Sequence, residues 1–308
     1  MALPTSGAAW NNIVSAANGS WGSANLADNN SDHDMMVMAG ALVAARTDNA
    51  AMRSKVVSGI NSLRNSGFAR VLEMSRNVPG YVIAADVIGL KDVDASTDQW
   101  FRGFIAGLRT KPLTGHGGGD NMRETAMFST NNWGGRSRAA MVAIDLYLGD
   151  TTDIRDMVTA QRGYLGEAVS HRLSFTSTNW HANPSNKAGI NRRGATIQGR
   201  NVDGVVPEDQ RRSGEFSWPA PAGNYPWGAL QGESMAASML HRAGLMSFRA
   251  GDDAIARAAR WLYNVNNNPA SGDDTATPWI INKYAGTSFP TSSASVGKSI
   301  AWTDWTHQ

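Results

Sequence analysis

Apolar residues recur at the three- and four-residue spacing of a helix along most of this chain, and strand-like alternation is scarce. Residues 33–47 are the clearest case, because Met35, Met38 and Leu42 share one face and Asp32 or Asp34 can cap its start. Further helices are expected at about 56–63, 71–74, 81–90, 101–108, 133–148, 152–169, 227–243 and 252–263. Short strands are expected only near 195–197 and 280–284.

The expected helices follow one another through short connections with no strands between them, which favours an all-α fold. We expect one domain, residues 1–308, in which antiparallel helical hairpins close into an incomplete α/α toroid. An open solenoid is the alternative, but no fixed-period repeat of the kind that solenoids need is visible.

Residues 171–226 interrupt this pattern with an irregular stretch rich in Asn, Pro, Gly, Arg and Trp. A loop of that length inside a compact domain is usually functional, so we expect it to lie over a groove. The tail from residue 272 onward is expected to be loop-like.

Composition excludes several classes of protein. Hydrophobic residues make up 42% and charged residues 18%, and no apolar run approaches the roughly 20 residues that span a bilayer, so no membrane segment is expected. The net charge is only +2 without dense basic blocks, which argues against nucleic acid as a partner. Residues 187–212 nevertheless hold six basic and three acidic side chains, a balance that would attract a polyanion.

Common catalytic and metal motifs are absent: there is no H-E-x-x-H, no G-x-S-x-G and no P-loop, and the Cys count is zero. The acidic run at 28–34 lacks the Gly and Glu of a calcium loop, so helix capping is expected there. No metal and no cofactor is expected.

Paired carboxylates for glycoside hydrolysis could come from Glu208 with Asp209, or from Asp273 with Asp274. Acids that are adjacent in sequence seldom face each other across a substrate. Ion pairing with Arg211 and Arg212, and turn capping, are therefore the more expected roles of these two pairs.

A larger constellation suits β-elimination on a uronic acid. The C5 proton of a uronate becomes acidic only when its carboxylate is neutralised, which Asn amides and Arg guanidinium groups can do. A Tyr or His then removes that proton, and the same or another Tyr protonates the departing O4 without a metal. The residues of these types are Asn131, Asn132, Trp133, Trp180, His181, Arg211, Arg212 and Tyr225.

Five segments carry a resemblance to a known family. They are NNWGGRSRAAMVAIDLYLGD at 131–150, GINRRGATIQGRNVDGVVPEDQRRSGEFSWP at 189–219, NYPWGALQG at 224–232, GDDTATPWIINKYAGTSFP at 272–290 and WTDWTH at 302–307. The chain resembles the alginate-lyase superfamily over nearly its whole length, and in particular the α/α-toroid polysaccharide lyases of families 5 and 38.

The resemblance implies roles for individual residues. Asn132 matches the Asn that neutralises the uronate carboxylate, Arg211 or Arg212 its helper, and Tyr225 the proton-transfer Tyr. Family 5 enzymes have Asn-Asn-His where this chain has Trp133, so another histidine must serve. His181 is the first choice, with His116 and His171 as alternatives, and Gly228 stands where an acidic residue is expected.

We therefore expect a secreted or periplasmic, monomeric lyase that cleaves an anionic polysaccharide, a β-1,4-linked uronic-acid polymer. Alginate or polymannuronate is the first expected substrate and glucuronan the second, with the signal peptide already removed. A glycoside hydrolase and a non-catalytic polyanion-binding protein are the rivals from other classes. The residues expected to bind substrate are Asn131, Trp133, Arg211, Trp180, Trp218 and His116.

Overall fold

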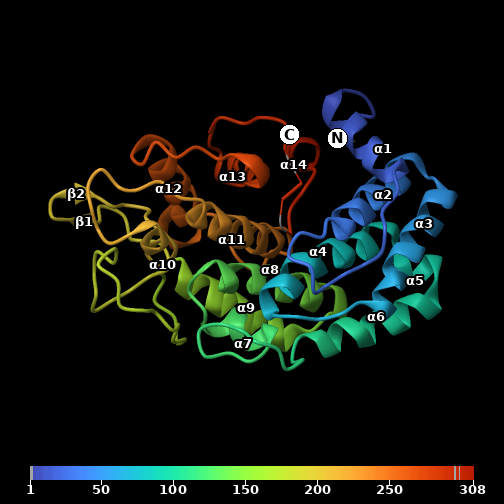
Figure 1. Cartoon of the computed structure of the whole chain (residues 1–308), viewed down its shortest axis with the longest axis horizontal. Coiled ribbons are helices and arrows are strands. Elements are labelled where there is room, and N and C mark those ends of the chain that lie inside the picture. The colour runs from blue at the N-terminus through green and yellow to red at the C-terminus, as the bar shows by residue number, and fades with distance from the viewer. Residues whose placement is uncertain (1–2, 295, 298) are drawn as a thin grey trace.

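The computed structural model describes residues 3–294, 296–297 and 299–308, and these are mostly helical (Figure 1). The predicted all-α class is confirmed. The helices are α1 (Ala8–Asn18), α2 (His33–Thr47), α3 (Ala50–Asn61), α4 (Val71–Ile88), α5 (Leu90–Val93), α6 (Ala95–Leu108), α7 (Met122–Phe128), α8 (Asn132–Leu148), α9 (Thr151–Tyr164), α10 (Pro207–Gln210), α11 (Tyr225–Arg242), α12 (Ala250–Asn264), α13 (Thr277–Ala285) and α14 (Thr303–Thr306). Short 3-10 helices are η1 (Ser62–Asn65), η2 (Arg211–Ser213) and η3 (Gly272–Ala276).

Residues 71–88 form one helix, where the sequence predicted two separated at Pro79-Gly80. Proline inside a helix deprives the carbonyl four residues earlier of its hydrogen bond. Here that carbonyl belongs to Ser75, and the hydroxyl of Ser299 donates to it (3.4 Å). Gly80 leaves no room for a Cβ because Met35 and Asp34 of α2 press against it. Tertiary contacts from α2 and the C-terminal segment thus compensate for the proline.

Other sequence predictions agree or fail at particular elements. The strand expected near 195–197 is β1 (Thr196–Ile197), which pairs antiparallel with β2 (Arg200–Asn201). The strand expected at 280–284 is wrong, because these residues belong to α13, and the tail from 272 contains η3, α13 and α14. Asp32 stands at the N-cap of α2, but its side chain makes no capping hydrogen bond.

The centre of the molecule is the pair α8 and α11, which run parallel and pack closely. The two helices approach closely at Gly232 because this residue has no Cβ. A Cβ there would lie only 2.5 Å from the backbone nitrogen of Arg136. Arg138 of α8 forms an ion pair with Glu233 of α11, and both side chains are fully buried. The amino ends of the two helices therefore lie at the same end of the pair.

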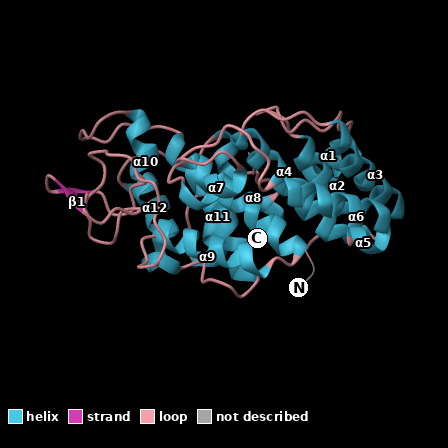
Figure 2. Ribbon diagram, turned by 90° about the horizontal axis from the view of Figure 1, so that it is seen from below, coloured by secondary structure: helices cyan, strands magenta, loops and turns pink. Residues whose placement is uncertain are grey.

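Helices α1 to α6 occupy one end of the molecule, and the β1–β2 hairpin with its flanking loops occupies the other (Figure 1). Seen from below, loops run along one side above α4, α7 and α8 (Figure 2). Among the described residues, no helix combines the length and the apolar character needed to cross a bilayer.

Candidate functional site

A polar cleft of about 190 Å³ opens where the amino ends of α8 and α11 meet. We call it the central cleft. Each helix amino end carries a partial positive charge, so two of them side by side favour an anion. The lining residues are Arg76, Asn132, Arg136, Asn224, Tyr225, Gly228, Gln231, Asp273 and Asp274.

Asn132 is the first residue of α8 and presents its side chain to the cleft. Asn131 before it caps the helix, because its Oδ1 accepts from the backbone N–H of Trp133 (3.0 Å). The backbone N–H of Asn132 donates to Oδ1 of the buried Asp209 (3.1 Å). Its side-chain amide makes no hydrogen bond with any described residue, and Oδ1 is buried. An amide fixed at its backbone and free at its head is available to a ligand.

Tyr225 begins α11 and is 36% exposed at the cleft. Nη2 of Arg212 donates to its hydroxyl (3.1 Å), and the guanidinium lies 4.3 Å from the ring centroid. Pro226 follows at the start of the helix, where its missing N–H costs nothing. The structure thus brings together the predicted Asn132, Tyr225 and Arg212.

Two arginines that the sequence analysis missed supply the positive charge of the cleft. Arg76 comes from α4 and Arg136 from α8, one helical turn after Asn132. Burial lowers the pKa of both groups, and the pKa of Arg136, at about 9, leaves that guanidinium cationic at neutral pH. Gly228 lies beside Arg136, since a Cβ there would be in ordinary contact with Nη2 at 3.9 Å.

An acidic wall from η3 faces the same cleft. Nε2 of Gln231 donates both to the carbonyl of Asp273 (3.2 Å) and to Oδ1 of Asp274 (2.5 Å). Oε1 of Gln231 accepts from Nη2 of Arg136 (2.9 Å), so Gln231 links the cationic and acidic sides. Burial, followed by the charge of Asp273, raises the pKa of Asp274 to about 7.

His181 and Trp180 do not line the central cleft. His181 is 3% exposed and its Nε2 lies 3.0 Å from Oε1 of Glu208, which also accepts from Thr176. Burial acts to raise the pKa of Glu208, but the hydrogen bonds from His181 and Thr176 outweigh it and the pKa is lowered. Trp180 is fully buried and donates to the carbonyl of Gly214 (2.8 Å), so its ring offers no face to a sugar. Both residues hold the long loop together.

His116 contacts the Asn pair through Asn131, although it is not among the residues that line the central cleft. Its Nε2 lies 3.1 Å from Nδ2 of Asn131, and its ring lies 5.8 Å from that of Trp133. Burial and the positive charge of Arg211 lower the pKa of His116, so its imidazole is neutral at neutral pH. A Cβ on Gly117 would meet the backbone of Ser129, so the glycine loop can pack closely against this segment.

The remaining predicted residues lie around the cleft or away from it. Arg211 forms an ion pair with Glu208 (3.4 Å), and Trp133 lies under the guanidinium of Arg70 (5.6 Å). Trp218 packs against Arg200 of β2 (5.7 Å). His171 contacts the carbonyl of Met127 (2.6 Å), outside the residues that line the cleft.

The carboxyl groups at 208–209, considered above as a hydrolase pair, contact other groups of the protein. Asp209 is fully buried, and burial raises its pKa to about 8, so it is largely protonated at neutral pH. Glu208 is engaged by Thr176, His181 and Arg211. Neither carboxyl group lines the cleft.

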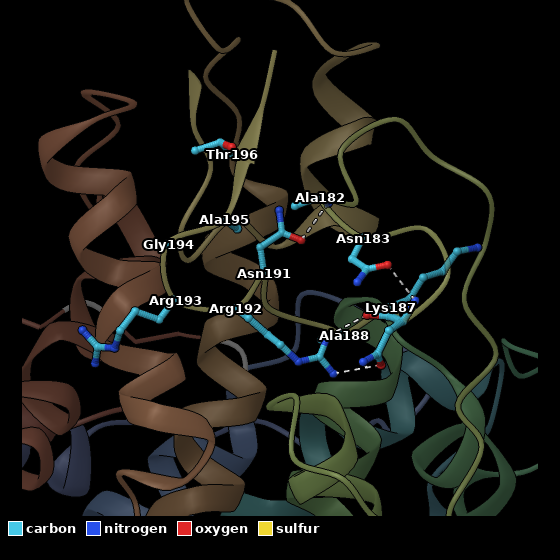
Figure 3. Close-up of a pocket in the computed structure, with 11 residues that line it drawn as sticks. Ala182, Asn183, Lys187, Ala188, Asn191, Arg192, Arg193, Gly194, Ala195 and Thr196 are labelled. Atoms are coloured by element: carbon cyan, nitrogen blue, oxygen red, sulfur yellow. Dashed lines mark hydrogen bonds between the residues drawn. The ribbon is translucent and has the colours of Figure 1, made fainter. Parts of the chain in front are cut away.

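A second hollow of about 240 Å³ lies between residues 182–188 and 191–196 of the long loop. We call it the loop pocket (Figure 3). Its basic side chains are engaged with the protein: Arg192 donates to the carbonyls of Asn186 and Gly166, and Lys187 to that of Thr176. Arg193 points away from them toward α12 and forms an ion pair with Asp252. Part of the positive charge expected at 187–212 is thus engaged in contacts within the protein.

One group of acids among the described residues has the spacing of a metal site: Asp145, Asp150 and Asp153. Nη1 of Arg109 already lies 2.7 to 3.2 Å from an oxygen of each carboxylate. The cluster is therefore an ion-pair network that joins α8 and α9 to the end of α6.

Comparisons of the chain with family models, with curated proteins and with solved structures returned no match.

Proposed function

We propose that this protein is a polysaccharide lyase that cleaves a β-1,4-linked uronic-acid polymer by β-elimination. One observation carries the proposal: a free Asn132 amide and an Arg-bound Tyr225 hydroxyl share a cleft at two helix amino ends. These groups supply the charge neutralisation and proton transfer that the reaction needs. We propose polymannuronate or alginate as substrate, with glucuronan as the second choice.

The substrate carboxylate would bind at the amino end of α8. The amide of Asn132 and the guanidinium groups of Arg76 and Arg136 would neutralise it, helped by the two helix dipoles. This interaction strengthens as negative charge moves from C5 onto the carboxylate, so it stabilises the transition state more than bound substrate.

The chemical step needs one proton removed and one delivered. The base takes the proton from C5. The electron pair of that C5–H bond forms the C4–C5 double bond, and the C4–O4 bond breaks as O4 takes up a proton. Tyr225 would deliver that proton from a hydroxyl that Nη2 of Arg212 holds in place. His116, neutral and next to Asn131, replaces His181 as the candidate base, with Tyr225 alone as the alternative.

The architecture that we propose for this site is an incomplete α/α toroid in which α8 and α11 form the inner wall. A single catalytic domain of residues 1–308, a monomeric state and a secreted or periplasmic location complete the proposal. The anionic polysaccharide is the only partner proposed.

Incubation with polymannuronate, alginate and glucuronan tests the activity directly. The lyase reaction creates an unsaturated uronate at the new non-reducing end, which is followed by its ultraviolet absorbance. Absence of an absorbance rise on all three polymers would refute the proposal.

Glycoside hydrolysis is the second candidate, because Asp273 and Asp274 line the cleft and the pKa of Asp274 is raised to about 7. A carboxyl group with such a pKa can act as a general acid. New reducing ends without unsaturation, together with their loss in Asp274→Asn, would favour this reaction over β-elimination.

A further inference from the structure

The acidic wall of the central cleft is not explained by carboxylate binding. Arginines and an amide suffice to hold an anion, and an additional carboxylate in the same space opposes it. Asp273 makes no side-chain hydrogen bond and no ion pair with any residue in the described part of the chain. No described residue therefore donates a hydrogen bond to its two oxygens, although its charge acts on Arg76 and Arg136.

The position of Asp273 is nevertheless fixed. Gln231 binds both its backbone carbonyl and the neighbouring Asp274, and Gln231 is itself held by Arg136. A side chain whose backbone is anchored from α11, and whose acceptors face an open cleft, is preorganised for a donor on a ligand.

The cleft is small and has mixed polarity. Its volume of about 190 Å³ lies below the roughly 300 to 1,000 Å³ of pockets for drug-sized ligands, so it suits a single sugar ring. A uronate ring carries its carboxylate on C5 and its hydroxyl donors at C2 and C3. Cations and an amide match the first group, and a carboxylate with two acceptor oxygens matches a pair of neighbouring hydroxyls.

We propose that Asp273 accepts hydrogen bonds from the ring hydroxyls of the uronate whose carboxylate is held by Asn132, so that the cleft selects units with free hydroxyls. This inference rests on the proposed function. It makes Asp273 a specificity-determining residue, with Gln231 and Asp274 as the groups that position it.

The test compares mannuronan with the same polymer acetylated at O2 and O3, using kcat/KM from the ultraviolet absorbance of the unsaturated product. The wild-type protein should prefer the free-hydroxyl polymer by about tenfold or more, as expected for hydrogen bonds to a charged group. In Asp273→Asn and Asp273→Ala, that preference should fall to about threefold or less, and the loss should be confined to the unmodified polymer. Asp92→Asn, at an exposed position in α5, is the matched control and should keep the wild-type preference.

Three outcomes would overturn the inference: equal rates on both polymers in the wild type, a preference that persists in Asp273→Asn, or equal losses on both polymers. If neither polymer is cleaved, the proposed function fails, and calorimetric Kd values for the two polymers test hydroxyl recognition separately. A wild-type preference in Kd that Asp273→Asn abolishes would support recognition without catalysis, and equal Kd values would overturn it.

Discussion

The central cleft and the loop pocket contain the same residue types but use them differently. Both contain arginines and asparagines, yet Arg192 and Asn186 of the loop pocket bond to each other and to nearby carbonyls. In the central cleft, the amide of Asn132 and the carboxylate of Asp273 remain unused by the described residues. Residue type alone therefore does not identify a site. Polar side chains that have no partner among the described residues are what distinguish the central cleft.

The largest effect is expected when one hydroxyl is removed from the central cleft, and its absence would contradict the difference between the two regions. Tyr225→Phe should lower kcat by about 10²- to 10⁴-fold, the usual contribution of a general acid or base, with little change in KM. Steady-state kinetics on polymannuronate measure both constants. Tyr263→Phe, which removes a hydroxyl bonded to the carbonyl of Pro290 outside the cleft, is the control and should stay near wild type. A Tyr225→Phe rate close to wild type would remove Tyr225 from the mechanism.

A matched pair of asparagines tests the comparison directly. Asn132→Ala should lower kcat by about 10²- to 10³-fold, because it deletes a donor to the charge that develops on the carboxylate. Asn186→Ala in the loop pocket should change kcat less than twofold, since its side chain bonds to the protein's own Arg192. Equal effects of the two substitutions would abolish the distinction between the two regions.

The histidines offer a contrast between catalysis and stability. His116→Ala should lower kcat/KM by about tenfold or more if the imidazole next to Asn131 takes part in proton transfer. His181→Ala should instead lower thermal stability by about 1 to 3 kcal/mol, because it leaves the buried Glu208 short of a partner. Thermal melting and kinetics on both variants separate the roles. A melting temperature unchanged in His181→Ala with kcat greatly reduced would restore the original assignment of His181.

The sequence was sufficient for most of the helices, because periodicity carries that information. Its motifs singled out Asn132 and Tyr225 but left Arg211 and Arg212 as alternatives, and the structure places Arg212 on Tyr225. The sequence failed where tertiary contacts decide. Pro79 lies within a continuous helix because the hydroxyl of Ser299 donates to the carbonyl of Ser75, which the proline leaves without a backbone donor. Similarly, no local pattern distinguishes Arg76 from a surface arginine, because its place in the cleft depends on how α4 packs against α8.

The long loop illustrates the same limit. The Asn-, Trp- and Arg-rich segment was expected to lie over a groove with Trp180 and His181 at the substrate, and the structure instead buries both side chains. Aromatic and polar residues can also be what a loop needs to form a small core of its own with satisfied hydrogen bonds. Binding a ligand and forming such a core differ in the partner of each polar group, and the sequence does not specify that partner.

The charge of Asp274 should produce a smaller, pH-dependent effect in the central cleft. Its pKa is raised to about 7, so it is protonated below that pH and becomes an additional negative charge above it. KM for a polyuronate should therefore rise by up to about fivefold as the pH increases through about 7, because the carboxylate of Asp274 repels the carboxylates of the substrate. Asp274→Asn should flatten this profile. A profile identical to wild type in that variant would exclude Asp274 as its cause.

The smallest effect is expected in the loop pocket. Arg192→Ala removes a cation whose hydrogen bonds all go to residues 166 and 186, so kcat and KM on polymannuronate should each stay within about twofold of wild type. Its loss should appear in thermal stability, by about 1 kcal/mol, because those carbonyls lose a charged donor. Arg76→Ala provides the contrast, since it deletes a cation that lines the central cleft and should raise KM about tenfold. A tenfold rise in KM for Arg192→Ala would mean that the loop pocket also binds the polymer. The difference between the two regions would then be one of degree.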